Sequence, residues 1–151
     1  ASRSLVDLVL SGHAHCFEYL RTEDTGHGDR NIPWVVCGGS GFSLRRQRKE
    51  GPVLEEYGQP VAKCHLFLGR SGHGSKKYRP YSALRVDVSY KDSETPAFVL
   101  RPLVAERYQG DWRNYEAGPI SLSSGPEELS QLQPNIERER QQLRDEESQD
   151  D

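Results

Sequence analysis

A short apolar segment followed directly by two closely spaced histidines is the feature that most constrains this chain. Residues 5–10 are leucine and valine apart from one aspartate, and the sequence continues Ser-Gly-His-Ala-His through His15. Such an apolar run ending at a glycine predicts a buried strand, and the ends of strands are where sheet proteins present ligand-binding residues. Because a loop does not send alternate side chains to opposite faces, His13 and His15 can both face metal. The sequence therefore predicts half of a metal site at the end of its first strand.

Residues 6–18 resemble the last metal-binding motif of the calcineurin-like metallophosphoesterases, the superfamily that includes the purple acid phosphatases. In that motif an apolar strand is followed by Gly-His-x-His and often by a small residue, an aromatic residue and Glu, here Cys16, Phe17 and Glu18. Residues 32–41, of sequence IPWVVCGGSG, resemble the strand and glycine-rich turn that usually follow it. The resemblance implies an α/β fold, mostly β in this portion, as the C-terminal part of a four-layer α/β/β/α sandwich.

The resemblance also implies a reaction and a set of ligands. Such domains hydrolyse phosphate esters with hydroxide held on two divalent or trivalent metal ions, Fe, Mn or Zn, and neutral imidazoles suit these metals. By resemblance, His13 binds one metal, shared with a Gly-Asn-His motif and an isolated His. His15 binds the other, shared with an Asp-x-His motif, and Glu18 orients a ligand histidine. The glycines at residues 38–41 let the backbone pass near the metals.

The other metal-binding motifs of the superfamily all precede Gly-His-x-His. Here that motif begins at residue 12, so the remaining motifs would have to lie upstream of Ala1. The Gly-Asp pairs at residues 28–29 and 110–111 come later and follow no apolar strand. We therefore expect a C-terminal portion that needs the N-terminal half of its domain as a partner, binds metal weakly by itself and is inactive alone.

Two other hypotheses stay open on the sequence. A non-catalytic remnant or interaction module would pack its strands against a partner chain and engage a partner through its acidic C-terminal end. A cupin-type mononuclear metal protein would also carry His-x-His followed by Glu, although Glu18 lies closer to His15 than the usual cupin spacing requires.

Composition limits the classes of partner. Only 34% of residues are hydrophobic and the mean hydropathy is -0.82, below the usual globular share. A net charge of -3 does not favour binding to nucleic acid, which normally requires a basic surface. No apolar stretch approaches the roughly 18 residues of a membrane span. The cysteines Cys16, Cys37 and Cys64 are odd in number and widely spaced, which fits reduced thiols and slightly favours a soluble, cytoplasmic protein.

The chain divides into two predicted parts: residues 1–112, the phosphoesterase portion, and residues 113–151, a polar and acidic tail. Alternating apolar residues predict a half-buried strand over residues 82–88 and a return strand over residues 97–104, forming an antiparallel hairpin. Residues 61–68 fit either one more strand or an apolar patch on a loop. Residues 45–49, of sequence RRQRK, are interpreted as a solvated surface loop. The tail sustains no apolar periodicity, so we expect a frayed helix or disorder there.

Overall fold

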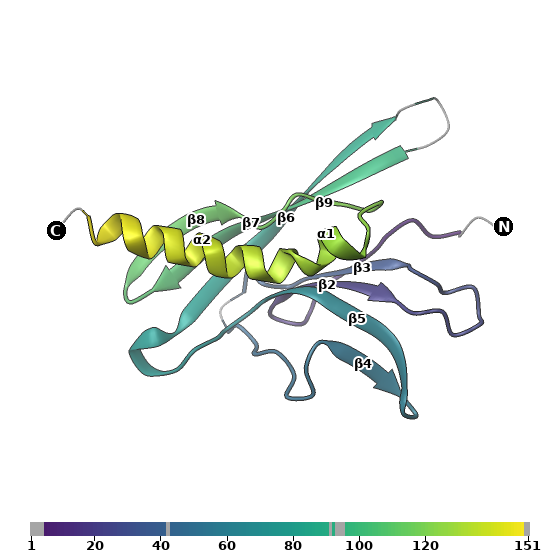
Figure 1. Ribbon diagram of the computed structural model, residues 1–151, viewed down its shortest axis with the longest axis horizontal. Coiled ribbons are helices and arrows are strands. Elements are labelled where there is room, and N and C mark those ends of the chain that lie inside the picture. The colour runs from purple at the N-terminus through teal and green to yellow at the C-terminus, as the bar shows by residue number, and fades with distance from the viewer. Residues whose placement is uncertain (1–4, 42, 91, 93–95, 150–151) are drawn as a thin grey trace.

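The computed structural model describes residues 5–41, 43–90, 92 and 96–149, which form two β-sheets and a C-terminal helical segment (Figure 1). Strands account for 45% of the described residues and helices for 17%, so this part of the protein is mostly β, as expected for this portion. Apart from the short 3₁₀ helix η1 Gly74–Lys76, the helices lie at the C-terminal end of the chain and pack across the strands.

The first sheet contains five strands in the order β1-β3-β2-β5-β4. Their bounds are β1 Val9–Ser11, β2 Phe17–Thr22, β3 Pro33–Cys37, β4 Val53–Glu56 and β5 Gln59–Leu68. Only the β1 and β3 pair is parallel, and the other pairs are antiparallel. The segment at residues 61–68 is therefore a strand.

The first predicted strand is shorter and more exposed than its apolar sequence indicates. Only residues 9–11 form β1, Leu5 is fully exposed and the Leu10 side chain is 56% exposed. Its side chains are exposed because β1 lies at the edge of the sheet and, among the described strands, pairs with β3 alone. Of the apolar run, Leu8 packs against the main core.

The central strand β2 was missed by sequence analysis, although its residues 17–21 are all buried. Glu18 and Arg21 interrupt its apolar pattern, so the sequence does not indicate a buried strand. Both find partners: Glu18 pairs with Arg45, and Arg21 donates to the Tyr19 hydroxyl at 2.7 Å and to the Leu122 carbonyl at 2.7 Å. A charged side chain can occupy a buried strand when its polar groups are satisfied in this way.

The second sheet is built on a long antiparallel hairpin, which confirms the predicted pair of strands. Its strands are β6 Tyr78–Tyr90, β7 Pro96–Tyr108, β8 Asp111–Glu116 and β9 Ile120–Ser121. In the hairpin Ser82 lies opposite Val104 and Val88 opposite Phe98. β8 and β9 both pair with β7. Most of the expected turn, residues 91 and 93–95, lies outside the described residues.

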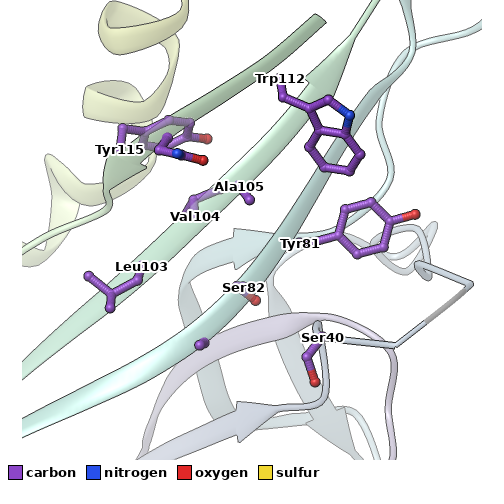
Figure 2. Close-up of a pocket in the computed structure, with 10 residues that line it drawn as sticks. Ser40, Tyr81, Ser82, Leu103, Val104, Ala105, Trp112 and Tyr115 are labelled. Atoms are coloured by element: carbon purple, nitrogen blue, oxygen red, sulfur yellow. The ribbon is translucent and has the colours of Figure 1, made fainter. Parts of the chain in front are cut away.

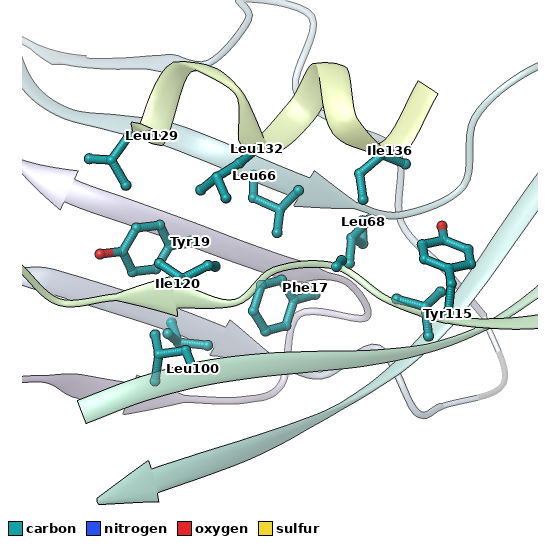
Figure 3. Close-up of a cluster of buried hydrophobic side chains, with 13 residues drawn as sticks. Phe17, Tyr19, Leu66, Leu68, Leu100, Tyr115, Ile120, Leu129, Leu132 and Ile136 are labelled. Carbon is teal, nitrogen blue, oxygen red and sulfur yellow. The ribbon is translucent and has the colours of Figure 1, made fainter. Parts of the chain in front are cut away.

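One hydrophobic core joins the two sheets and the helical segment (Figure 3). The first sheet contributes Phe17, Tyr19, Val35, Leu66 and Leu68; the second contributes Leu100, Val104, Tyr115 and Ile120; and the helical segment contributes Leu129, Leu132 and Ile136. The two sheets therefore do not form separate units, because their apolar faces are buried against the same side chains.

The C-terminal segment, for which the sequence left a frayed helix or disorder open, is helical and packs on the core. It forms α1 Pro126–Ser130 and α2 Leu132–Glu147, and a boundary at residue 112 would fall inside β8. The buried positions Leu129, Leu132, Ile136 and Arg140 follow helical spacing. Because the last of them is an arginine, the stripe does not look apolar in sequence. Among the described residues, neither helix combines the length and apolar character that a membrane span requires.

Arg140 fastens α2 to the second sheet through a buried ion pair. Its Nη2 atom lies 2.6 Å from Glu106 Oε1, and the side chains of the pair are 7% and 3% exposed. Its guanidinium also lies over the Tyr78 ring, 4.2 Å from the centroid. Tyr115 donates its hydroxyl to the same Glu106 oxygen at 3.1 Å. Burial, and then the Glu106 carboxylate, raise the pKa of Tyr115, so its hydroxyl keeps its proton.

We expect Arg140→Met to destabilise the chain strongly, because it leaves the Glu106 carboxylate buried without its cation. The loss should be about 3–5 kcal/mol in the free energy of unfolding, measured by urea denaturation. The control is Arg138→Met, at an exposed position of the same helix, which should change stability by about 0.5 kcal/mol or less. Adding Glu106→Gln to Arg140→Met should recover part of the loss. Equal effects of the two methionine variants would contradict this role.

Candidate functional site

The two sequence motifs lie together at one edge of the first sheet. The histidine loop, residues 12–15, follows the last residue of β1, and the glycine turn, residues 38–41, follows the last residue of β3. These strands are parallel, with Ser11 opposite Val36. Their carboxyl ends therefore reach the same edge, which is where open sheets with parallel strands hold ligands.

The glycine turn packs directly against the backbone of the histidine loop. A Cβ atom at Gly38 would lie 2.0 Å from the Ala14 carbonyl oxygen, and one at Gly39 would lie 3.3 Å from the Cys16 carbonyl carbon. The Gly38 N–H donates to the Cys16 carbonyl at 3.0 Å. A side chain at Gly38 would push the two segments apart, so the absence of a side chain here lets the histidine loop pack against the glycine turn.

The histidine loop is held in two consecutive tight turns. Ala14 N–H donates to the Gly12 carbonyl at 2.9 Å, and Cys16 N–H donates to the Ala14 carbonyl at 2.8 Å. His13 has a φ of 73°, in the left-handed region that non-glycine residues seldom adopt. Such backbone strain persists where surrounding structure imposes it, and it clusters at functional sites. The loop leaves His13 and His15 both exposed.

The His15 ring is oriented by a backbone carbonyl. Its Nδ1 atom lies 2.8 Å from the carbonyl oxygen of Ser43. Because a carbonyl only accepts hydrogen bonds, Nδ1 carries the proton, and Nε2 of the neutral ring keeps its lone pair. Histidines that bind metals show this arrangement, in which the second ring nitrogen donates to a carbonyl or carboxylate.

Glu18 reaches the histidine loop through Arg45. Its Oε1 atom accepts from Arg45 Nη2 at 2.8 Å, and the backbone N–H of Arg45 donates to the His15 carbonyl at 2.8 Å. Among the described residues Glu18 forms no hydrogen bond to an imidazole, so its connection to His15 runs through Arg45. Residues 45–49 are interpreted from the sequence as a solvated surface loop, but the Arg45 side chain makes contacts within the protein. Besides its bond to Glu18, it donates to Cys16 Sγ at 3.4 Å.

The cysteines of this region are buried free thiols. Cys16 and Cys64 are buried, Cys37 is half-buried, and none of them forms a disulfide. Burial raises the pKa of Cys16, against the opposing effect of Arg45, and raises that of Cys64 to about 12. They are therefore protonated near neutral pH and pack as small apolar side chains.

The other histidines lie away from the histidine loop in sequence, and His65 is part of the sheet. It lies on β5 with its ring centroid 6.4 Å from that of Tyr19. Burial, Lys63 and Arg21 lower the pKa of His65 to about 4, so it is neutral at physiological pH. Over residues 5–41, 43–90, 92 and 96–149, no three His, Cys, Asp or Glu side chains gather to hold a metal ion.

Sequence analysis identified the two histidines but not what positions them. Ser43 acts through its backbone carbonyl, which no side-chain pattern reveals, and Arg45 is hidden in a run of basic residues. The repeated glycines were the one visible signal of the close backbone contact. Comparisons with protein-family models, curated proteins and solved structures found no match to this chain.

We expect Gly38→Ala to displace the histidine loop, because the new methyl group would overlap the Ala14 carbonyl. The free energy of unfolding should fall by about 1–3 kcal/mol, and the ring resonances of His13 and His15 should shift in NMR spectra. The control is Gly12→Ala, where a Cβ would meet nothing nearer than 3.9 Å. If both variants leave the resonances in place, the contact does not seat the loop.

We also expect neutral His15 to carry its ring proton on Nδ1. Long-range ¹H–¹⁵N correlation spectra of the chain at pH 8 can assign the protonated nitrogen of each ring. His13 provides an internal comparison, since its ring forms no hydrogen bond among the described residues. Finding the His15 proton on Nε2 would show that the Ser43 carbonyl does not orient this ring in solution.

Proposed function

We propose that this chain is the C-terminal portion of a calcineurin-like, purple acid phosphatase-like metallophosphoesterase domain that hydrolyses phosphate esters. In this proposal the histidine loop supplies two metal ligands, His13 and His15. The observation that carries it is the 2.8 Å hydrogen bond from His15 Nδ1 to the Ser43 carbonyl, which leaves Nε2 available to a metal ion.

The remaining geometry of the loop supports the same assignment. Both histidines are exposed at the carboxyl edge of a parallel strand pair, and His13 is held at a strained φ of 73°. The close contact of Gly38 with Ala14 and the bond from Arg45 to the His15 carbonyl hold the loop from two sides. A loop fixed this firmly can present two imidazoles without further ordering when a ligand binds.

The donor set fits borderline metal ions. Two neutral imidazoles suit Fe, Mn or Zn, and two such ions, when bound, offset the negative charge of the phosphoryl oxygens and supply the attacking hydroxide. Each residue of this chain then has a defined task. His13 and His15 hold the ions, the Ser43 carbonyl keeps the His15 ring in its binding tautomer, and the Glu18 and Arg45 pair supports the loop backbone.

The exposed edge of the first sheet supports an N-terminal half that completes the domain. Among the described strands β1 pairs with β3 alone, and Leu10 on β1 and Trp34 on β3 are 56% and 40% exposed. An open strand edge flanked by large apolar side chains is a surface on which further polypeptide packs. In our proposal that polypeptide is the upstream half of a four-layer α/β/β/α sandwich, which brings the carboxylates and remaining metal ligands.

The same edge also favours a second candidate, a non-catalytic module that packs on a partner chain. The two candidates differ in what His13 and His15 do. In the phosphoesterase they are needed for metal binding and turnover, whereas in an interaction module their removal leaves partner binding intact.

We expect His13→Ala and His15→Ala each to lower aryl phosphatase activity of the whole domain by about two orders of magnitude or more, with loss of bound metal. The control is His73→Ala, at an exposed position outside the loop, which should change activity little. Metal content of each purified variant is measured beside its rate. Activity and metal retained in both loop variants would contradict the assignment and favour the interaction module.

The 151-residue chain alone provides the complementary measurement. Incubated with manganese, zinc or iron, it should show no turnover above the metal blank, and adding the upstream half should restore activity through the same two histidines. Turnover by the chain alone that disappears in His13→Ala would show that residues of this chain complete the site.

A further inference from the structure

A hollow on the second sheet borders the glycine turn and has no role in the proposed metal chemistry (Figure 2). Its volume is about 610 Å³, and Ser40, Tyr81, Ala105, Trp112 and Asn114 are among the residues that line it. Tyr81, Ala105 and Asn114 lie opposite one another across three strands. Their side chains therefore share one face of the sheet, opposite to the face that buries Val104 and Tyr115.

The hollow has aromatic walls and a floor of small side chains. The Tyr81 and Trp112 rings lie 5.7 Å apart between centroids at an angle of 38°, and Trp112 is 57% exposed. Ala83 and Ala105 beside them leave the space between the larger side chains open. Two tilted, accessible rings next to open space form a surface on which another planar ring can stack.

Two arginines adjoin the aromatic wall. Arg79 lies directly opposite Arg107, and Arg107 lies opposite Trp112 with its guanidinium carbon 5.9 Å from the indole centroid. Like charges directly opposite on neighbouring strands destabilise a sheet. Among the described residues neither arginine has an ion-pair partner, so the chain leaves two positive charges together beside an exposed indole.

The middle of the same hairpin holds a second pair of facing arginines, which are neutralised by carboxylates. There Arg85 and Arg101 also lie opposite each other, but both bind Asp87 at 2.8 Å, and Arg101 also binds Glu116 at 2.8 Å. The contrast indicates that the Arg79 and Arg107 pair is matched by a negative charge from outside the chain. Arginine binds phosphate and carboxylate groups in this way.

The hollow also touches the edge that carries the histidine loop. Ser40 belongs to the glycine turn, and the next residue, Gly41, would place a Cβ 3.8 Å from the His15 ring. The Ser82 N–H donates to the Gly39 carbonyl at 3.1 Å, which joins strand β6 beside the hollow to the glycine turn.

We propose that this hollow binds a small ligand in which a planar aromatic ring is joined to a negatively charged group, as in a nucleoside monophosphate. The ring stacks on Trp112 and Tyr81, and the Arg79 and Arg107 pair binds the anion. This inference goes beyond the proposed phosphoesterase function and does not require metal at His13 and His15, so either can fail without the other.

The test follows the fluorescence of Trp112 in the full chain. The sequence contains two tryptophans, so Trp34→Phe leaves Trp112 as the sole indole. Adenosine monophosphate, titrated in EDTA to exclude metal, should quench this emission saturably. Adenosine, which lacks the charge, and ribose 5-phosphate, which lacks the ring, should each bind roughly tenfold more weakly.

Two substitutions in the same background should weaken the binding of adenosine monophosphate roughly tenfold. Ala105→Leu fills the hollow and Arg107→Gln removes one charge, while circular dichroism confirms that each variant folds. Arg85→Gln, in the middle of the hairpin where the arginine pairs with Asp87, should leave binding unchanged. No saturable quenching, or quenching that neither substitution weakens, would overturn the proposal. An affinity that rises with the length of a single-stranded oligonucleotide would also overturn it in favour of a nucleic-acid surface.

Discussion

The close contact between the glycine turn and the histidine loop is the constraint on which the candidate site depends. Gly38 meets the Ala14 carbonyl at a distance that leaves no space for a side chain, and the parallel pairing of β1 with β3 brings the two segments to the same edge. Since the loop cannot relax away from the turn, His13 keeps its positive φ and His15 stays within reach of the Ser43 carbonyl. The chemistry of two imidazoles follows from this backbone arrangement.

Buried charged side chains also hold the two sheets and helix α2 together. Arg21 on the central strand donates to the carbonyl of Leu122, and Glu106 on β7 holds Arg140 on α2. Each contact joins segments far apart in sequence, and each would leave an uncompensated buried group if its partner moved. The apolar core supplies the bulk of the buried surface, while these polar contacts determine which arrangement of sheet and helix is allowed.

The edge that carries the histidine loop and the aromatic hollow meet at the glycine turn. Gly41 lies next to the His15 ring, and the preceding Ser40 lines the hollow on the second sheet. Ser82 N–H donates to the Gly39 carbonyl at 3.1 Å, which ties β6 to the turn. If both proposals hold, a ligand seated in the hollow lies beside the edge where phosphate esters are hydrolysed.

The sequence by itself predicted the hairpin of β6 and β7 and the pair of histidines after a strand, because alternation and the Gly-His-x-His spacing are local patterns. The mostly β character was implied by the family resemblance. The sequence did not reveal β2 or the buried face of α2, which include Glu18, Arg21 and Arg140, since a charge in a pattern looks solvent-exposed until its partner is known. The tertiary structure alone decided that Glu18 supports the loop through Arg45 and that a backbone carbonyl orients His15. Those contacts join residues 27 and 28 positions apart, and only the folded backbone brings them within hydrogen-bonding distance.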